Sequence, residues 1–180
     1  MNRSTIVALS FGLLTAIGVT AYAATAANKP GPEQKKLEAF VGTWTYVGEA
    51  KDNPFGPAGK ITGTDVYEML PGGFFLQHRW EEKNPLGPVH GTEIWGYDPI
   101  KKAYTYNYFT SLGEMGSGTF TISGNTWNFA GSGITYEGKT AHGRASLIVA
   151  GSSAFTVKAE ASPDGKKFAP AFEGKWTRKN

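Results

Sequence analysis

The residue best placed to do chemistry is His78, in the run FFLQHRWEE that spans residues 74–82. Alternate side chains of a β-strand share a face, so His78 lies with Leu76 and Trp80 on the more apolar face. A buried polar group without a partner costs about 1–3 kcal/mol, so the imidazole needs one. Two interpretations stay open: a core histidine with a hydrogen-bond partner, or a group that orients a ligand or binds a metal or haem. The candidate partners are Glu68, Glu93 and Tyr104.

Other routes to catalysis have weaker support. The chain has no Cys, which removes thiol nucleophiles, Cys-based metal sites and disulfides. It lacks the G-x-S-x-G pattern of serine hydrolases, and GSG at 116–118 and 131–133 is expected to form turns or bulges. Glu81 and Glu82 are adjacent, so they point to opposite faces of a strand, and the three His have no short metal-ligand spacing. We therefore predict no catalytic residue, no metal site and no cofactor, and favour a noncatalytic role.

Acid–base catalysis by paired carboxyl groups remains an alternative. Asp65, Glu68 and Glu93 all stand on strand-like runs and would form such a pair if they converged inside the fold. The simpler interpretation is that they satisfy buried hydroxyl groups or are solvated. An enzyme that uses the interior around His78 is thus the alternative hypothesis.

Aromatic side chains give the chain its binding potential. It holds five Trp, eight Tyr and eleven Phe in 180 residues. Small-molecule pockets are lined mainly by apolar and aromatic side chains with a few polar groups, although the same residues could simply fill a core. The sequence does not determine which face of the strand at 103–110 points inward. Tyr104, Tyr106 and Tyr108 share one face, and Asn107 and Phe109 share the other. The predicted ligand-binding residues are His78, Trp80, Trp95, Tyr104, Tyr106, Tyr108 and Trp127.

The elements that must position these residues are short strands. After residue 41 no helical periodicity occurs, and turn signals such as LPGG at 70–73 and SPDG at 162–165 separate runs of apolar and β-branched residues. This pattern predicts an antiparallel sandwich or barrel. A short helix is expected over 32–40, begun by Pro32. The predicted strands are 43–50, 60–69, 73–82, 91–97, 103–110, 117–122, 126–130, 140–149, 154–161 and 172–178.

The N-terminal segment is typical of a secretory signal peptide. Arg3 precedes an apolar run from Ile6 to Val19, and AYA at 21–23 has the small-x-small pattern of a cleavage site. An uncleaved membrane anchor is the alternative, but the run is shorter than the ~20 residues of a span. We expect a signal peptide at 1–23, a linker at 24–31 and one domain at 32–180. The protein would then be periplasmic or extracellular, without membrane insertion after cleavage.

The charge balance argues against nucleic acid as a partner. The formal net charge is +3, and cleavage after residue 23 would remove Arg3 and leave +2 (3 − 1). The basic residues form pairs, such as Lys101-Lys102, where nucleic-acid binding needs a cluster on one face. The expected partner is a small apolar or amphipathic ligand, and the sequence does not determine the oligomeric state.

Several stretches resemble a known bacterial family, the domain of unknown function 1579. They include LEAFVGTW at 37–44, PFGPAGKITG at 54–63, LPGGFFLQHRW at 70–80, GTEIWGYDPIKKAYTYNYFTS at 91–111 and GTFTISGNTWNF at 118–129. The family is similar to the calycin group, so the resemblance implies an all-β, antiparallel, lipocalin-like closed barrel of about ten strands with a short N-terminal helix plugging one end. It also implies that first and last strands pair, with Arg178 lying across Trp44 as a structural closure.

The resemblance carries little functional information, since the family's name records no activity. The nitrobindin group of haem-binding barrels uses an axial His, and none of His78, His90 and His142 matches that axial position; His90 is expected in a loop. The sequence thus predicts an exported protein that binds a small apolar or amphipathic ligand. The alternative is an enzyme or haem-binding protein that uses the barrel interior around His78.

Overall fold

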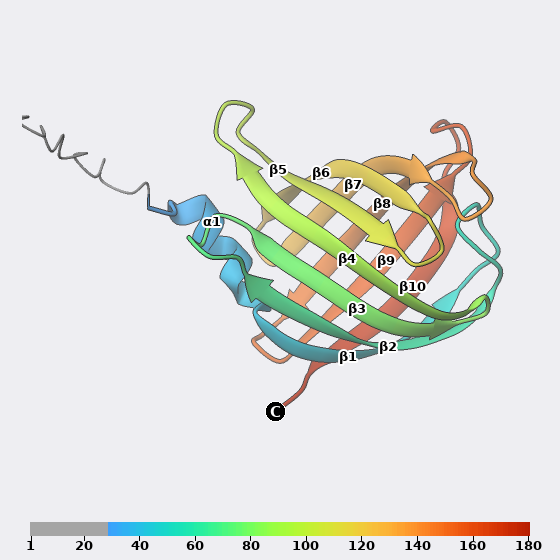
Figure 1. Cartoon of the computed structure of the whole chain (residues 1–180), viewed down its shortest axis with the longest axis horizontal. Coiled ribbons are helices and arrows are strands. Elements are labelled where there is room, and N and C mark those ends of the chain that lie inside the picture. The colour runs from blue at the N-terminus through green and yellow to red at the C-terminus, as the bar shows by residue number, and fades with distance from the viewer. Residues whose placement is uncertain (1–28) are drawn as a thin grey trace, which may run out of the picture.

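The chain folds into a closed antiparallel β-barrel of ten strands (Figure 1). The computed structural model describes residues 29–180. Each strand pairs with its neighbours in sequence, and β1 also pairs with β10, which confirms the predicted fold. The elements are α1 Pro32–Lys36, the 3₁₀ helix η1 Leu37–Phe40, β1 Gly42–Ala50, β2 Gly59–Met69, β3 Leu76–Asn84, β4 Gly87–Asp98, β5 Ala103–Thr110, β6 Met115–Ser123, β7 Thr126–Ile134, β8 Thr140–Ala150, β9 Ala154–Ser162 and β10 Ala169–Arg178.

The predicted signal peptide at 1–23 and the first part of the predicted linker, 24–28, lie outside the described residues. Among residues 29–180, no helix has the length and hydropathy to cross a membrane.

The barrel closes at the pairing of β1 with β10. Trp44 is the register partner of Arg178, whose guanidinium carbon lies 4.2 Å from the indole centroid. The guanidinium also donates to the carbonyl oxygens of Ala39 (2.9 Å) and Val41, and Nε donates to that of Ser152 (2.7 Å). One side chain therefore ties the last strand to the first strand and to the helical segment before it, because a guanidinium offers several donors in a fixed plane.

The helical segment plugs one end of the barrel, as Figure 1 shows. Leu37 and Phe40 are fully buried, and the Phe40 ring meets Trp127 edge-on at 4.8 Å and Trp95 at 5.4 Å. The indole nitrogen of Trp44 donates to the Phe40 carbonyl (2.7 Å), which fixes the plug to β1. The densest part of the aromatic core therefore lies at the plugged end. We call the opposite end, where the loop 51–58 and the turns after β3 and β5 gather, the open end.

Three local predictions need correction. His90 lies on β4 and not in a loop, exposed on the outer face. The GSG stretches at 116–118 and 131–133 are not turns or bulges but paired parts of β6 and β7, in register from Gly116↔Gly133 to Gly118↔Gly131. Their glycines make room for aromatic rings, since a Cβ on Gly116 would lie 2.5 Å from Tyr108 Cε1 and one on Gly118 2.7 Å from Tyr106 Cε1. A third difference is that β3 begins at Leu76, three residues later than expected.

Candidate functional site

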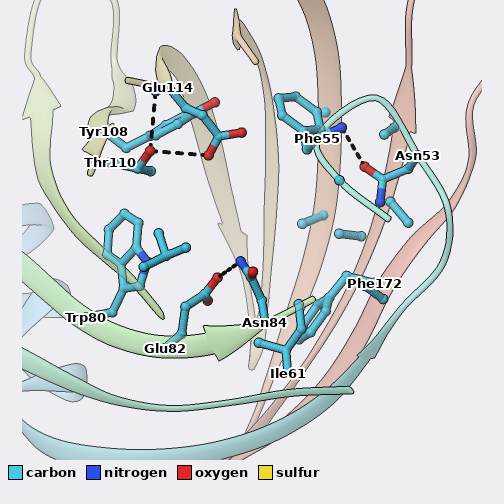
Figure 2. Close-up of a pocket in the computed structure, with 18 of the residues that line it drawn as sticks. Asn53, Phe55, Ile61, Trp80, Glu82, Asn84, Tyr108, Thr110, Glu114 and Phe172 are labelled. Atoms are coloured by element: carbon cyan, nitrogen blue, oxygen red, sulfur yellow. Dashed lines mark hydrogen bonds between the residues drawn. The ribbon is translucent and has the colours of Figure 1, made fainter. Parts of the chain in front are cut away.

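A cavity of about 450 Å³ occupies the open-end half of the barrel interior. We call it the open-end cavity. Its outer rim is formed by the loop 51–58, the turn at 85–86 and the segment 111–114, and its wall by inward-facing residues of the strands. Figure 2 shows Trp80, Tyr108, Phe55 and Phe172 on different sides of this space. The cavity is thus the part of the interior that the plug residues Leu37 and Phe40 do not reach.

The cavity wall is predominantly aromatic because glycines on adjacent strands leave room for large rings. Trp80 lies over Gly91, and Tyr106 and Tyr108 lie over the glycines of β6 and β7. Their strand, β5, points these tyrosines inward, while Phe109 is 48% exposed on the outer face. This settles the inner face of residues 103–110 in favour of the tyrosines. The other aromatic members of the wall are Tyr46, Phe129, Phe172 and Trp176.

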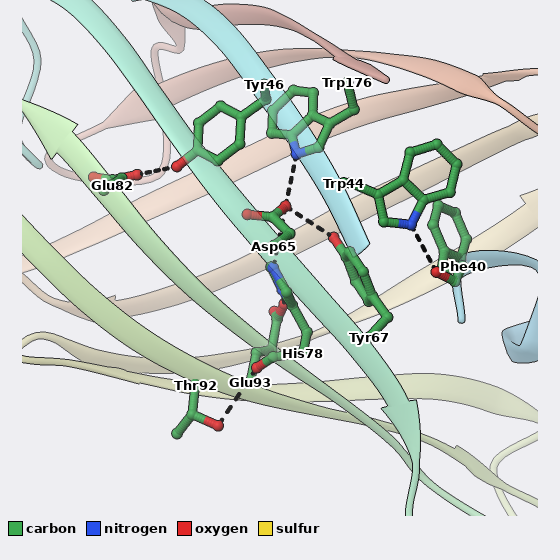
Figure 3. Close-up of polar contacts among 10 residues, drawn as sticks. All are labelled: Phe40, Trp44, Tyr46, Asp65, Tyr67, His78, Glu82, Thr92, Glu93 and Trp176. Carbon is green, nitrogen blue, oxygen red and sulfur yellow. Dashed lines mark hydrogen bonds and ion pairs between the residues drawn. The ribbon is translucent and has the colours of Figure 1, made fainter. Parts of the chain in front are cut away.

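A buried polar cluster of Asp65, His78 and Glu93 forms the inner end of the cavity (Figure 3). His78 Nδ1 lies 3.1 Å from Glu93 Oε2 and Nε2 lies 3.3 Å from Asp65 Oδ2. These contacts follow from strand register, since His78 pairs directly with Glu93 on β4 and with Tyr67 on β2. Tyr67 stacks on the imidazole with a centroid distance of 4.1 Å. We call these three residues the Asp65–His78–Glu93 cluster.

The cluster favours a protonated His78. Burial of the ring lowers its pKa, but the charges of Asp65 and Glu93 and their contacts with the two ring nitrogens outweigh burial and raise the pKa to about 9. Asp65 Oδ2 also accepts a hydrogen bond from the indole Nε1 of Trp176 (2.6 Å). Among the described residues, neither Asp65 Oδ1 nor His78 Nε2 has a hydrogen-bond partner, although Nε2 is ion-paired with Asp65 Oδ2 and Asp65 is only 2% exposed. One carboxylate oxygen at the inner end of the cavity is therefore unsatisfied.

Two further carboxyl groups lie nearer the rim, Glu114 in the upper part and Glu82 in the lower part of Figure 2. Glu82 accepts hydrogen bonds from Tyr46 (2.6 Å) and from the Asn84 amide (2.7 Å). Glu114 accepts one from Thr110 (3.3 Å), while its Oε1 is buried without a partner within residues 29–180. Burial raises the pKa of Glu114, and the charge of Glu82 raises it further. The cavity therefore carries acidic groups at both depths.

Comparison with known proteins identifies the family. Residues 29–178 match the family described as "Protein of unknown function (DUF1579)". The chain belongs to this family. This confirms the resemblance seen in the sequence motifs, and it covers nearly all of the described chain. A comparison of this DUF1579 protein with the curated proteins found no match.

Solved structures share the fold of this DUF1579 barrel. Rv2717c from M. tuberculosis is 14% identical, with 83% of this chain and 99% of that chain covered and a TM-score of 0.63. The S-type phycobiliprotein lyase CPES from Guillardia theta is 10% identical, with 82% and 93% covered and a TM-score of 0.54. At such low identity, these likenesses show the barrel fold alone.

The structure separates the predicted ligand-binding residues of this DUF1579 protein into two groups. His78, Trp80, Tyr106 and Tyr108 line the open-end cavity. Trp95, Tyr104 and Trp127 also face inward, but they are buried in the packed core and do not line it. They lie at the plugged end, where Phe40 contacts Trp95 and Trp127, and the Tyr104 hydroxyl donates to Glu33 of α1.

Sequence reasoning missed part of the cavity wall. The predicted ligand-binding residues do not include Tyr46, Glu82, Glu114 and Trp176. Asp65 is predicted only as a candidate acid–base carboxylate or as a group that satisfies buried hydroxyls or is solvated. The signal for Asp65 was present, because it alternates with Ile61 and Tyr67 on one face of β2. Of the other proposed carboxylates, Glu68 is on the outer face and pairs with Arg79 at 2.7 Å.

Proposed function

We propose that this DUF1579 protein is a noncatalytic binding protein that holds one small, largely apolar or amphipathic ligand in the open-end cavity. The observation that carries the proposal is the cavity itself, about 450 Å³ with aromatic walls and a few converging polar groups. That volume falls within the roughly 300–1,000 Å³ of small-molecule sites, whose lining has the same mixed character. Trp80, Tyr106 and Tyr108 supply apolar surface, and the Asp65–His78–Glu93 cluster supplies polar contacts at the inner end.

The geometry of His78 favours binding over the enzyme and haem alternatives. A general base must be unprotonated at the working pH, whereas the two carboxyl partners raise the pKa of His78 to about 9. An axial haem ligand needs one imidazole nitrogen directed at the iron. Both nitrogens of His78 instead face carboxyl oxygens, at 3.1 and 3.3 Å. The two ion pairs of His78 therefore favour a role in binding over a role as a haem ligand.

We further propose that the protein is exported to the periplasm or the extracellular space. The support is the sequence of residues 1–23, with its basic start, apolar run and AYA motif. Cell fractionation followed by N-terminal sequencing of the mature protein tests this proposal. We expect a new N-terminus near Ala24 in the exported fraction. A full-length chain in the cytosol, or one retained in the inner membrane, would contradict it.

Mass spectrometry of material released on denaturation tests the binding proposal directly. We expect one small molecule to co-purify with the protein, and Nile red, a neutral apolar dye, to bind saturably at a one-to-one ratio. Ala145→Trp supplies a blocked cavity, because Ala145 lines the cavity with a small side chain. Ile148→Trp is the matched control, since Ile148 is on the same strand but is 40% exposed on the outer face.

Loss of ligand and dye in Ala145→Trp with retention in Ile148→Trp would support the cavity as the site. A wild-type protein that releases nothing and does not bind Nile red saturably would contradict the proposal. Equal binding by both tryptophan variants would place the site elsewhere.

A further inference from the structure

The charged groups of the open-end cavity are unevenly divided. The acidic residues in its lining are Asp65, Glu82, Glu93, Glu114 and Glu160, and the basic residues are His78 and Arg144. Neither basic group is free among the described residues. His78 is held between two carboxyl groups, and Arg144 Nε lies 2.6 Å from Glu160 Oε2 on the outer face. When the ion pairs of His78 and Arg144 are left out, the carboxyl groups of Glu82 and Glu114 remain without a basic partner in the cavity lining.

The acidic residues Glu82 and Glu114 line the cavity, where their carboxyl groups can contact a ligand. Glu114 lies in the upper part and Glu82 in the lower part of Figure 2. Glu114 Oε1 and the deeply buried Asp65 Oδ1 have no hydrogen-bond partner within residues 29–180. An unpaired buried acceptor is costly, so a donor that enters the cavity would be stabilised by it. Like charges that face one space also repel, and a cation between them would offset this repulsion.

The aromatic wall complements a cation as well as an apolar group. The faces of Trp and Tyr rings attract positive charge through the ring quadrupole, most strongly where water is excluded. Trp80 and Tyr108 flank the space near Glu82 and Glu114, as Figure 2 shows. Burial raises the pKa of Tyr108 to about 12, and the charges of Glu114 and Glu93 contribute. The phenol thus stays neutral, and its ring lies in a region of negative potential.

An anionic ligand would meet the opposite situation. Its charge would lose hydration on entry, and the basic lining residues of the described part of the chain, His78 and Arg144, are already ion-paired with carboxyl groups. It would also lie close to Glu82 and Glu114. Fatty acids and similar carboxylates are therefore poor candidates on electrostatic grounds, although their chains would suit the aromatic wall.

We propose that the ligand of the open-end cavity is an organic cation, an amine or quaternary ammonium group on an apolar body, with Glu82 and Glu114 as its charge partners. This inference rests on the proposed binding function and adds the chemical class of the ligand. The apolar body packs against Trp80 and Tyr108, and the cationic group lies between the two carboxyl groups.

Three probes of nearly equal size and different charge test the inference: phenylbutylamine, phenylbutanol and phenylbutyrate. Each is titrated into the wild-type protein at neutral pH, with calorimetry and tryptophan fluorescence as readouts. We expect the amine to bind about tenfold or more tightly than the alcohol, from ion pairing and cation–π attraction in a desolvated site. We expect the carboxylate to bind most weakly.

The double variant Glu82→Gln with Glu114→Gln keeps the size and hydrogen-bonding oxygen of each side chain. It should lose most of the preference for the amine and keep the affinity for the alcohol. Glu81→Gln is the matched control, because Glu81 neighbours Glu82 on β3 but is on the outer face, with its side chain 80% exposed. This control should behave as wild type. Circular dichroism checks the fold, and the wild-type series stands by itself if the double variant does not fold.

The outcomes separate the two proposals. Equal binding of amine and alcohol, or tightest binding of the carboxylate, would overturn the cation inference and leave the binding function in place. An amine preference that persists unchanged in a folded double variant would overturn the assignment to Glu82 and Glu114. Binding by none of the three probes would overturn the inference, and the Nile red titration would show whether the binding function falls with it.

Discussion

An increase of pH above neutrality should destabilise the barrel through a single side chain, His78. Its pKa is raised from 6.5 to about 9 in the folded protein, where it lies between Asp65 and Glu93. A group with a raised folded pKa binds its proton more tightly in the native state than in the unfolded chain. Its contribution to stability is therefore complete below pH 6.5 and is lost as the pH rises through about 9.

The size of the effect follows from the shift. Each pKa unit is worth about 1.4 kcal/mol, so the shift from 6.5 to about 9 corresponds to about 3 kcal/mol in favour of folding. About 2 kcal/mol of this is lost between neutral pH and pH 9. Tyr67, which stacks on the imidazole, does not titrate in this window, because burial and the charge of Asp65 raise its pKa well above the ordinary value.

Urea denaturation followed by tryptophan fluorescence at several pH values measures this dependence. The free energy of unfolding of the wild-type protein should fall by up to about 1.4 kcal/mol per pH unit across the window. His78→Gln should be less stable at neutral pH and should lack most of this slope. His90→Gln is the matched control, since His90 is exposed on the outer face of β4, and it should keep the wild-type slope.

NMR titration of the imidazole C–H resonances gives an independent measure. A His78 pKa at or below 6.5 would refute the assignment of a protonated imidazole between two carboxyl groups. The same conclusion would follow if His78→Gln kept the full wild-type slope, because the titrating group would then lie elsewhere.

Further predictions concern the fold that supports the cavity. Phe40→Ala should lower the free energy of unfolding by about 3–5 kcal/mol in urea denaturation, since it empties the plug; a loss below 1 kcal/mol would contradict a packed plug. Gly116→Ala should cost about 1–3 kcal/mol, because its Cβ would lie 2.7 Å from the Ser132 carbonyl oxygen, while Gly143→Ala, with its nearest contact at 3.9 Å, should be tolerated. Arg178→Lys should lower the thermal midpoint, as it loses donors to the plug carbonyls at a cost of about 1–2 kcal/mol; an unchanged midpoint would argue against a closing role.

The sequence was sufficient for the strands and for most of their inner faces. Period-two alternation correctly placed His78 and Trp80 inside, and turn residues separated ten runs that correspond to the ten strands. Alternation left the inner face of residues 103–110 undetermined, because Tyr104, Tyr106 and Tyr108 are on one face and Phe109 is on the other. The side that faces inward depends on the glycines of β6, which make room for the tyrosine rings across the β5–β6 pairing.

Alternation shows which side chains face the barrel interior, but it does not show how far along the barrel axis each one lies. Trp95 and Trp127 face inward as Trp80 does, yet only Trp80 lines the cavity. The difference arises from the plug, because Phe40 fills the space beside Trp95 and Trp127. The distance over which a short helix enters a barrel depends on tertiary packing, which no pattern within one strand encodes.

The partners of His78 depended on register. Glu93 was one of three expected partners, and it is the residue directly opposite on β4. Asp65 lies diagonally across the β2–β3 pair from His78, on the same face of β2 as the direct partner Tyr67 and two residues before it. A slip of one residue in that pair would move Asp65 to the outer face, so its role becomes visible only when the register is known.

The position of the Asp65–His78–Glu93 cluster is itself an argument for a role in binding. Barrel closure is supplied by Arg178, and the packed core by the plug and the aromatic rings around it. Buried ion pairs add little net stability compared with well-packed apolar residues, because desolvation offsets their attraction. Relative to well-packed apolar residues, three charged groups at this depth therefore add little to the stability of the fold. The three groups lie where the packed half of the barrel meets the open-end cavity. Tyr67 stacks on the His78 ring, and the ring centroid of Trp80, a residue of the cavity wall, is 5.0 Å from that of His78. At that boundary the Asp65–His78–Glu93 cluster is placed to make polar contacts with a ligand in the open-end cavity.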